Sequence, residues 1–345
     1  MKILAKPWTR KELPKRILAI RLQAMGDVII TLPYLQALRN SLPQNTEIDL
    51  LTRKEFDAVP RSVELFNRIF SIGGGRSFKR QFVLCLLMLP KILWRRYDVV
   101  IDLQCTSISR LVRKFVAPKA WSEFDKTSPV AAGERTRLTI EAIQVGNIGS
   151  HKKFRIRSSN AADLLKKNGW ENENALVVLN PAGAFESRNW PIENYARFAQ
   201  LWLQEFPQTQ FLMMGVELIA NKATYLQSIF GDKLINLVSK TNPAEAFAII
   251  QKTSFVLSED SGLMHFAWVS GIPTFALFGS SRSDWSRPLG EHTLFLDSSD
   301  LPCGNCFMAQ CKYGDTHCLT RYTAEFVFEK AKELLSSTRR STVRE

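Results

Sequence analysis

Apolar runs of strand length alternate with segments of helical length throughout the chain. Short apolar runs bounded by polar turns are typical of strands buried on both faces, and strands that alternate with helices are typical of a mostly parallel sheet. In the first half of the chain this pattern predicts strands at 16–21, 47–52, 68–72 and 98–103, with helices at 28–40 and 79–96. It therefore predicts an α/β domain there.

The same alternation begins again after a polar stretch at 158–174. It predicts strands at 175–180, 210–215, 234–238, 254–258 and 273–279, with helices at 192–206, 217–230, 243–252, 262–270 and 323–337. Two such series predict two doubly wound α/β domains, with a ligand bound in the cleft between them at the carboxyl ends of the strands. The polar segment at 336–345 is predicted to be a disordered tail.

A chain of 345 residues is long enough for two domains, and its composition, 45% hydrophobic and 23% charged, is that of a soluble globular protein. The longest apolar run, FVLCLLMLPKILW at 82–94, is shorter than the about 20 residues needed to cross a bilayer. We interpret it as a core helix, with contact to lipid as the alternative. No apolar segment of signal-peptide length follows the basic start, so a cytoplasmic location is expected.

The net charge of +13 is unevenly distributed along the chain. Residues 1–170 hold 31 basic and 14 acidic side chains, whereas residues 171–345 hold 15 and 19. A strongly basic half is expected to face an anionic partner: nucleic acid, a phosphorylated substrate or a membrane surface.

Common catalytic motifs are absent from the sequence. No G-x-G-x-x-G follows the first strand, and neither G-x-x-x-x-G-K-[ST], G-x-S-x-G nor H-E-x-x-H occurs. A dinucleotide-dependent dehydrogenase, a P-loop NTPase, an α/β-hydrolase and a zinc protease are therefore not expected.

Three strand-end segments carry candidate chemistry. In SEDSGLMHFAWVSGIPTFALFG (258–279), Ser261 and Gly262 open a helix whose free N–H groups could bind an anion, with His265 about one turn further on. In IRLQAMGDVIITLP (20–33), Gly26 and Asp27 lie where the first strand turns into the first helix. In NPAGAFESRNWP (180–191), Arg188 could hold a diphosphate through two hydrogen bonds. The alternatives are an ordinary capped helix, an aspartate that is only an N-cap, and a surface arginine.

Taken together, four segments resemble the ADP-heptose:lipopolysaccharide heptosyltransferase family, glycosyltransferase family 9. They are GDVIITLP (26–33), RYDVVIDLQ (96–104), SRNWP (187–191) and DSGLMHFAWVSGIPTFALFG (260–279), and the resemblance covers nearly the whole chain. It implies a GT-B fold, with two facing Rossmann-like doubly wound domains. The N-terminal domain (1–165) would bind the acceptor and the C-terminal domain (166–335) the nucleotide sugar.

The resemblance also implies a reaction: transfer of a heptose from ADP-heptose to the inner core of lipopolysaccharide, with inversion at the anomeric carbon. The enzyme alternative is a GT-B transferase or epimerase that acts on another nucleotide sugar. The non-enzyme alternative, a basic nucleic-acid-binding protein, is disfavoured because the basic residues lack interleaved aromatics and no known nucleic-acid motif appears. The partners expected are the donor, an anionic lipopolysaccharide acceptor and the cytoplasmic surface of the inner membrane, with the protein acting as a monomer.

Site residues follow from the same resemblance. Asp27 would be the base that takes a proton from the acceptor hydroxyl. Arg188 stands where relatives commonly carry a lysine on the donor phosphate, and Cys105 stands where they often have glycine. Gly26 and Gln104 would lie on the acceptor side, and the donor would contact Asp260, Ser261, Gly262, Leu263 and His265, with Glu217 on its ribose. No metal or other cofactor is required, because a helix N-terminus and an arginine can stabilise the departing diphosphate.

Four of the six cysteines form a cluster with the spacing C-x2-C-x4-C-x6-C, at Cys303, Cys306, Cys311 and Cys318. Such a cluster resembles a structural zinc or iron–sulfur site. Reduced thiols or a labile disulfide are favoured over a bound metal. Cys85 and Cys105 are expected to be buried and inert.

Overall fold

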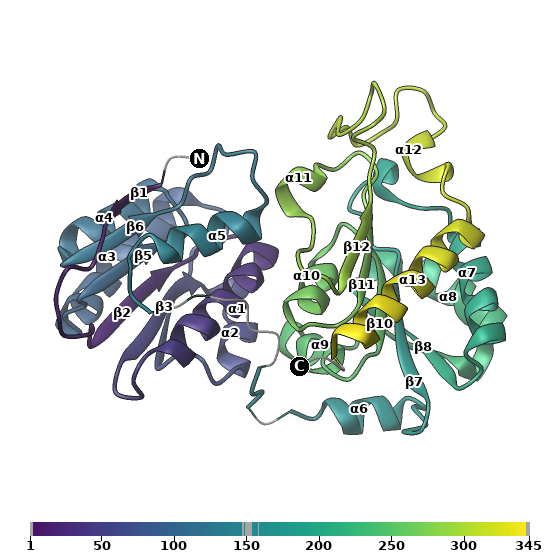
Figure 1. The fold of residues 1–345 in the computed structure, drawn as a ribbon, viewed down its shortest axis with the longest axis horizontal. Coiled ribbons are helices and arrows are strands. Elements are labelled where there is room, and N and C mark those ends of the chain that lie inside the picture. Colours follow the sequence, from purple (N-terminus) through teal and green to yellow (C-terminus); the bar gives the residue numbers. More distant parts are fainter. Residues whose placement is uncertain (1–2, 147, 149–153, 158, 343–345) are drawn as a thin grey trace. The chain divides into compact units, whose positions relative to one another are not determined.

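The computed structural model describes residues 3–146, 148, 154–157 and 159–342. The chain divides into two compact units, Met1–Ser158 and Ser159–Glu345 (Figure 1). Each unit contains one six-stranded sheet with helices packed on it. The division lies before α6 (Ala161–Lys167), whereas the predicted boundary at 165/166 falls inside that helix.

The sheet of the first unit has the strand order β1-β6-β5-β2-β3-β4. Only the pairing of β1 with β6 is antiparallel. The strands are β1 (Leu4–Lys6), β2 (Arg16–Ile20), β3 (Glu47–Arg53), β4 (Arg68–Ile72), β5 (Val99–Asp102) and β6 (Ala120–Glu123). The helices are α1 (Met25–Ser41), α2 (Ala58–Ser62), α3 (Phe78–Trp94), α4 (Ser107–Val116) and α5 (Ala132–Glu141), with a 3-10 turn η1 (Lys54–Phe56).

The sheet of the second unit is parallel throughout, with the order β12-β11-β10-β7-β8-β9. Its strands are β7 (Ala175–Asn180), β8 (Thr209–Gly215), β9 (Leu234–Val238), β10 (Phe255–Glu259), β11 (Thr274–Leu277) and β12 (Thr293–Leu296). After α6 its helices are α7 (Ile192–Glu205), α8 (Ala220–Phe230), α9 (Pro243–Ile250), α10 (Gly262–Val269), α11 (Ser283–Ser286), α12 (His317–Thr320) and α13 (Ala324–Thr342), with 3-10 turns η2 (Glu186–Arg188), η3 (Glu217–Ile219) and η4 (Gly231–Lys233). These two sheets confirm the predicted α/β fold class.

Both sheets reverse their strand order at one point. In the first unit the chain runs outward from β2 to β4 and then continues on the other side of β2 with β5. In the second it runs from β7 to β9 and then continues beside β7 with β10. Ligands of open α/β sheets bind at the carboxyl ends of the strands at such a switch point. The loops after β2 and β5, and after β7 and β10, are therefore where each unit is expected to bind its ligand.

Three details differ from the sequence expectations. The first helix begins at Met25 rather than at residue 28, so Asp27 lies inside its first turn. α13 continues to Thr342, so the prediction of a disordered tail is wrong for 336–342, while 343–345 lie outside the described residues. The apolar helix predicted to lie in the core buries one side only: its buried residues are Cys85, Leu89 and Ile92. No helix in the described part of the chain combines the length and the apolar character needed to cross a membrane.

Candidate functional site

Gln104 joins the two loops at the switch point of the first unit. Its side chain is buried in the loop after β5. The oxygen Oε1 accepts hydrogen bonds from the backbone N–H groups of Leu22 (2.7 Å) and Gln23 (3.0 Å), in the loop after β2. Gln104, predicted on the acceptor side, therefore fixes the loop that leads into α1, next to Gly26 and Asp27.

Asp27 is held in the first turn of α1 by two contacts. Its Oδ2 accepts from the backbone N–H of Ala24 (2.8 Å), and its Oδ1 pairs with Nη2 of Arg21 (2.8 Å). Ala24, not Asp27, is the N-cap residue, so the N-cap prediction was wrong in position although the carboxylate does satisfy a free N–H at the helix start. The Asp27 side chain remains 37% exposed, which leaves the carboxylate within reach of a ligand.

Arg21 is a site residue that the sequence analysis missed. Its side chain is buried at the end of β2, with the guanidinium 4.9 Å from the ring centroid of Phe124. Besides pairing with Asp27, it donates from Nη1 to the carbonyl of Leu103, in the loop after β5. An arginine directly after the apolar run 17–20 was the available signal, because a charge in that place must find partners when it is buried.

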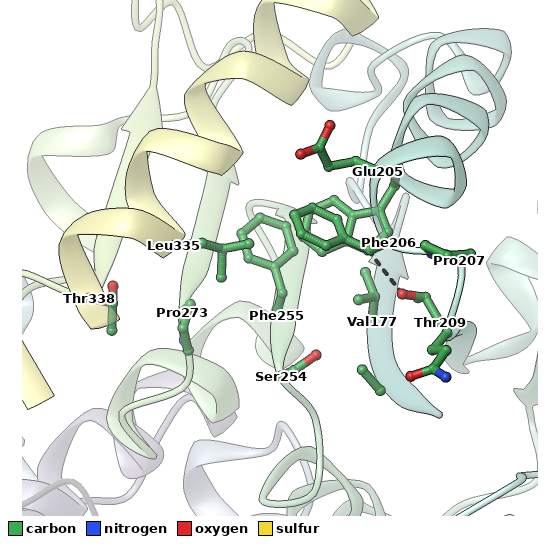
Figure 2. Close-up of a pocket in the computed structure, with 13 residues that line it drawn as sticks. Val177, Glu205, Phe206, Pro207, Thr209, Ser254, Phe255, Pro273, Leu335 and Thr338 are labelled. Atoms are coloured by element: carbon green, nitrogen blue, oxygen red, sulfur yellow. Dashed lines mark hydrogen bonds between the residues drawn. The ribbon is translucent and has the colours of Figure 1, made fainter. Parts of the chain in front are cut away.

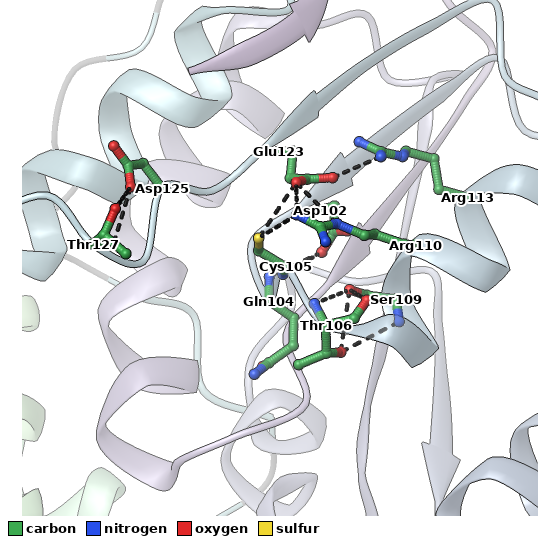
Figure 3. A network of polar contacts seen from close by, with 10 residues as sticks. All are labelled: Asp102, Gln104, Cys105, Thr106, Ser109, Arg110, Arg113, Glu123, Asp125 and Thr127. Atoms are coloured by element: carbon green, nitrogen blue, oxygen red, sulfur yellow. Dashed lines mark hydrogen bonds and ion pairs between the residues drawn. The ribbon is translucent and has the colours of Figure 1, made fainter. Parts of the chain in front are cut away.

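Cys105 adopts a backbone conformation that favours glycine. Its φ angle is +51°, and its N–H donates to Oδ1 of Asp102 (2.9 Å). Its Sγ donates to Oε1 of Glu123 (3.3 Å), and this contact is drawn in Figure 3. Burial, together with this carboxylate, raises the pKa of the Cys105 thiol, which is half-buried rather than buried as predicted. A left-handed conformation favours glycine, the residue that the resemblance implies at this position.

Arg188 is buried, not the surface arginine of the alternative interpretation. Its guanidinium lies between two aromatic rings, 4.7 Å from the centroid of Phe185 and 4.8 Å from that of Phe307. Nη1 lies 3.5 Å from Oδ2 of Asp260, which is long for a charge-assisted hydrogen bond. Nε is buried and has no hydrogen-bond partner among the described residues. The cation is thus oriented by stacking and keeps donor capacity for an anion.

Two further missed residues, Glu259 and Lys222, anchor the loop that carries Arg188. Glu259 is fully buried at the end of β10 and accepts from the backbone N–H groups of Gly183 (2.6 Å) and Trp190 (2.7 Å). Lys222 donates from Nζ to the carbonyl of Pro181 (2.7 Å). Burial raises the pKa of Glu259 to about 7, although the nearby Lys222 charge and the two N–H groups lower it, and burial lowers the pKa of Lys222.

The start of α10 is open on its outer side. A Cβ atom added to Gly262 would meet no other atom within 4 Å. Ser261, the N-cap residue, accepts from Nδ2 of Asn180 (2.6 Å) at the end of β7. Asp260 accepts from Oγ of Ser286 at 3.4 Å through Oδ1, and Leu263 is half-buried. The structure therefore brings Arg188, Asp260, Ser261 and Gly262 together at one switch point.

His265 and Glu217 are placed differently from that group. His265 is buried in α10, and its Nδ1 accepts from Nε1 of Trp268 (3.1 Å). Glu217 is exposed in η3, directly after β8, and accepts from Oγ of Ser239 (2.7 Å). Because β8 neighbours β7, Glu217 lies at the same edge of the sheet as the Arg188 loop, one strand further out.

The four clustered cysteines line one cavity of about 570 Å³ beside the Arg188 loop. They occur as free thiols, and within the described ranges no three His, Cys, Asp or Glu side chains are placed to hold a metal ion. Burial, and then the neighbouring thiols, raise the pKa of Cys318 to about 11. The same segment places Phe307, whose N–H donates to the carbonyl of Ser280 (2.8 Å).

A second cavity of about 570 Å³ lies at the opposite end of the same sheet (Figure 2). It is lined by residues at the starts of β7, β8 and β10, by the end of α7 and by α13, among them the apolar side chains of Phe206, Phe255 and Leu335. None of the predicted site residues lines it. This cavity is therefore separate from the switch-point site.

Comparison with known proteins gives a consistent result. The family model of glycosyltransferase family 9 (heptosyltransferase) matches residues 124–317. Lipooligosaccharide heptosyltransferase 2 of Haemophilus influenzae is 26% identical, and the match covers 52% of this chain and 54% of that protein. Lipopolysaccharide heptosyltransferase 1 of Pseudomonas aeruginosa is 24% identical, and the match covers 87% of this chain and 88% of that protein. The chain thus matches about half the length of some curated relatives and most of another.

Solved structures share the fold at low sequence identity. A glycosyltransferase family 9 protein of Veillonella parvula superimposes with a TM-score of 0.74 at 19% identity, covering 93% of this chain and 97% of its own. The Escherichia coli ADP-heptose lipopolysaccharide heptosyltransferase II superimposes with a TM-score of 0.69 at 18% identity, covering 93% of this chain and 98% of its own. These similarities confirm the GT-B fold class.

Proposed function

The chain belongs to glycosyltransferase family 9, and we propose that it transfers a heptose from a nucleotide sugar to the inner core of a lipopolysaccharide. The family, and with it the enzyme class of glycosyltransferase, is the one that the sequence predicted. One observation carries the proposal: in each unit, the segments that resemble the family lie at or directly beside the two strand ends of the topological switch point. A site built there in both sheets suits an enzyme with two substrates.

We assign the nucleotide-sugar donor, proposed to be ADP-heptose, to the second unit. The open N-terminus of α10 offers unpaired N–H groups, and Arg188 offers a fixed positive charge beside it. The departing nucleoside diphosphate gains charge on its bridging oxygen as the bond to the sugar breaks. A guanidinium and a helix N-terminus that are already in place stabilise that charge without reorganising.

We assign the acceptor to the first unit, with Asp27 as the base of an inverting displacement. The acceptor oxygen bonds to the anomeric carbon while the bond from that carbon to the diphosphate breaks. The acceptor proton passes to the Asp27 carboxylate, and the diphosphate leaves with the electron pair. Arg21 and the N–H of Ala24 orient the carboxylate, and its 37% exposure supports contact with a hydroxyl.

The first unit is also proposed to work at the cytoplasmic face of the inner membrane, where a lipopolysaccharide precursor would be anchored. Residues 1–158 hold 29 basic and 13 acidic side chains, which suits an acceptor that carries acidic sugars and phosphates. We propose that the protein acts as a monomer and does not bind nucleic acid.

Replacing Asp27 by asparagine tests this function. Asparagine can still accept from Ala24 but cannot take up the proton, so Asp27→Asn should lower turnover with ADP-heptose and a heptose-deficient core acceptor by about 10²–10⁴-fold. The donor Michaelis constant should stay within about twofold. The matched control is Asp163→Asn, an exposed aspartate of α6, which should keep wild-type turnover.

Two results would count against the proposal. If Asp27→Asn retains more than about a tenth of wild-type turnover, Asp27 only caps the helix. If the wild-type protein consumes a nucleotide sugar without any acceptor and returns an isomeric nucleotide sugar, the chain is an epimerase.

A further inference from the structure

The helix α3 is apolar on its outer side as well as on its inner side. Cys85, Leu89 and Ile92 face inward and pack with residues of β2 and β5. A surface helix of a globular protein normally turns a polar face to water. In α3 the exposed side chains are instead mostly large and apolar: Phe78, Val83, Leu84, Leu86, Leu87, Leu93 and Trp94.

The outermost positions of this helix carry the most exposed apolar groups. Val83, Leu87 and Trp94 are spaced four and seven residues apart, so they lie on one side of the helix. Their exposed fractions are 54%, 71% and 80%. A contiguous apolar surface of this kind marks a contact with a partner or a membrane. The neighbouring helix α4 adds Phe115, which is 54% exposed.

The chain segment that contains α3 carries positive charge only. No aspartate or glutamate occurs between Glu64 and Asp98. Five basic side chains that lie in α3 or within two residues of its ends are exposed, and none forms an ion pair within the described ranges: Arg76, Lys79, Arg80, Lys91 and Arg96. By helical spacing, Arg80 and Lys91 lie along one side of the row of Val83, Leu87 and Trp94.

We propose that α3 is an interfacial helix that docks the first unit on an anionic lipid surface, with Val83, Leu87 and Trp94 among the acyl chains and the basic side chains on lipid phosphates. Helices that lie in the plane of a membrane combine an apolar face bearing Trp or Leu with Lys and Arg beside it. A border of exposed lysine and arginine side chains with no acidic residue in the same segment suits the anionic headgroups of a membrane, and this favours lipid over a second protein. The proposal rests on the proposed function, because a lipid-anchored acceptor requires an enzyme that reaches the membrane.

Flotation of the full chain with lipid vesicles tests the docking surface. Wild-type protein should float with vesicles that contain phosphatidylglycerol and much less with vesicles of phosphatidylcholine alone. The double variant Leu87→Gln/Trp94→Gln should bind at least about tenfold more weakly, because binding no longer transfers two large apolar side chains from water into lipid. The matched control is Tyr225→Gln/Ile229→Gln, two exposed side chains of α8, which should bind like the wild type.

The basic side chains and the insertion of Trp94 can be tested separately. Lys79→Gln/Arg80→Gln/Lys91→Gln should weaken binding to phosphatidylglycerol vesicles and reduce its dependence on salt. Brominated lipid should quench part of the tryptophan fluorescence of the wild type, and Trp94→Phe should bind but lose that quenched part.

The outcomes separate this proposal from the proposed enzyme activity. Transfer to a soluble, lipid-free acceptor should be the same for Leu87→Gln/Trp94→Gln and the wild type. If the two proteins bind vesicles equally, α3 is not the docking surface, whatever the enzyme assay shows. A different result would show that the lipid proposal is wrong: the wild type does not bind vesicles, and light scattering shows a dimer for the wild type but not for the double variant. The outer side of α3 would then bind a second copy of the chain.

Discussion

At the scale of single residues, Arg188 depends on partners from distant parts of the second unit. Phe185 precedes it in the same loop, Asp260 follows β10, and Phe307 comes from the cysteine-containing segment. The sequence predicted an arginine in a strand-end loop, but its contact with Phe307 could not be predicted. Phe307 becomes a neighbour only because its segment folds back onto Ser280, which leaves no local signal.

Arg188 and Phe307 should act as a pair on the donor. Arg188→Ala should raise the donor Michaelis constant and lower turnover by about 10²–10³-fold, as expected for the loss of one group that stabilises developing charge. Phe307→Leu removes a stacking face and not the charge, so it should mainly raise the donor Michaelis constant. Arg188→Lys should recover part of the turnover but not the stacked geometry. Steady-state kinetics at saturating acceptor measure all three.

A double-mutant cycle separates positioning from simple loss of stability. Phe307→Leu should have little further effect in the Arg188→Ala background, because its role passes through the guanidinium. Phe326→Leu, at an exposed phenylalanine of α13, should leave both constants unchanged. Additive effects of the two substitutions would show that Phe307 does not act through Arg188.

At the scale of elements, the loop after β7 is fixed by a buried carboxylate. Glu259 bridges both ends of the loop, at Gly183 and Trp190, so that Arg188 is presented from a rigid segment. The strands and helices of this part of the chain could be predicted from the alternation of apolar and polar segments. The role of Glu259 could not be predicted, because a glutamate at a strand end looks the same in sequence whether it faces water or the interior.

Titration of Glu259 should make the second unit less stable as the pH rises. Its pKa is about 7 in the folded protein, above the ordinary 4.5. Between these two values the unfolded chain has already lost the proton that the folded protein keeps. The free energy of unfolding should therefore fall by about 3 kcal/mol across this window and change little above pH 7. Urea unfolding at pH 5 and pH 8 measures the change.

Two variants isolate this contribution from other titrating groups. Glu259→Gln cannot ionise, so the difference in unfolding free energy between pH 5 and pH 8 should shrink relative to the wild type. Glu193→Gln, at an exposed position of α7, should leave that difference as it is. Identical pH dependence in the wild type and Glu259→Gln would mean that Glu259 does not titrate in this range.

The same scale shows which elements the sequence could and could not reveal. Strands buried on both faces, such as β2, β5, β7 and β10, were predictable because a short, continuous apolar run is typical of a strand that is covered on both sides. The edge strands β1 and β12 were not, because β1 has three exposed residues and the residues of β12 are only half-buried. The exposure of the outer face of α3 could not be predicted, because a run of apolar residues does not indicate which of them the fold leaves uncovered.

At the scale of the whole molecule, charge distinguishes the two units. Residues 1–158 have a net charge of +16, from 29 basic and 13 acidic side chains, and residues 159–345 have a net charge of −3, from 17 and 20. Exposed charges attract an anionic partner over a distance that salt shortens, from about 10 Å at 0.1 M to about 3 Å at 1 M. A buried cation such as Arg188 is screened much less. The two proposed substrates should therefore respond differently to ionic strength.

Raising the salt concentration should weaken the binding of the acceptor far more than the binding of the donor. With a phosphorylated core acceptor in detergent-free solution, the acceptor Michaelis constant should rise by about tenfold between low and high salt, because the exposed basic side chains of the first unit supply the attraction. The donor Michaelis constant should change by no more than about twofold, since the donor diphosphate is proposed to contact a buried arginine and a helix N-terminus. An acceptor from which the phosphates have been removed serves as the control and should lose the salt dependence, because the enzyme and its donor are unchanged. Equal salt dependence for donor and acceptor would overturn the assignment of the acceptor to the basic unit, even if transfer itself is observed.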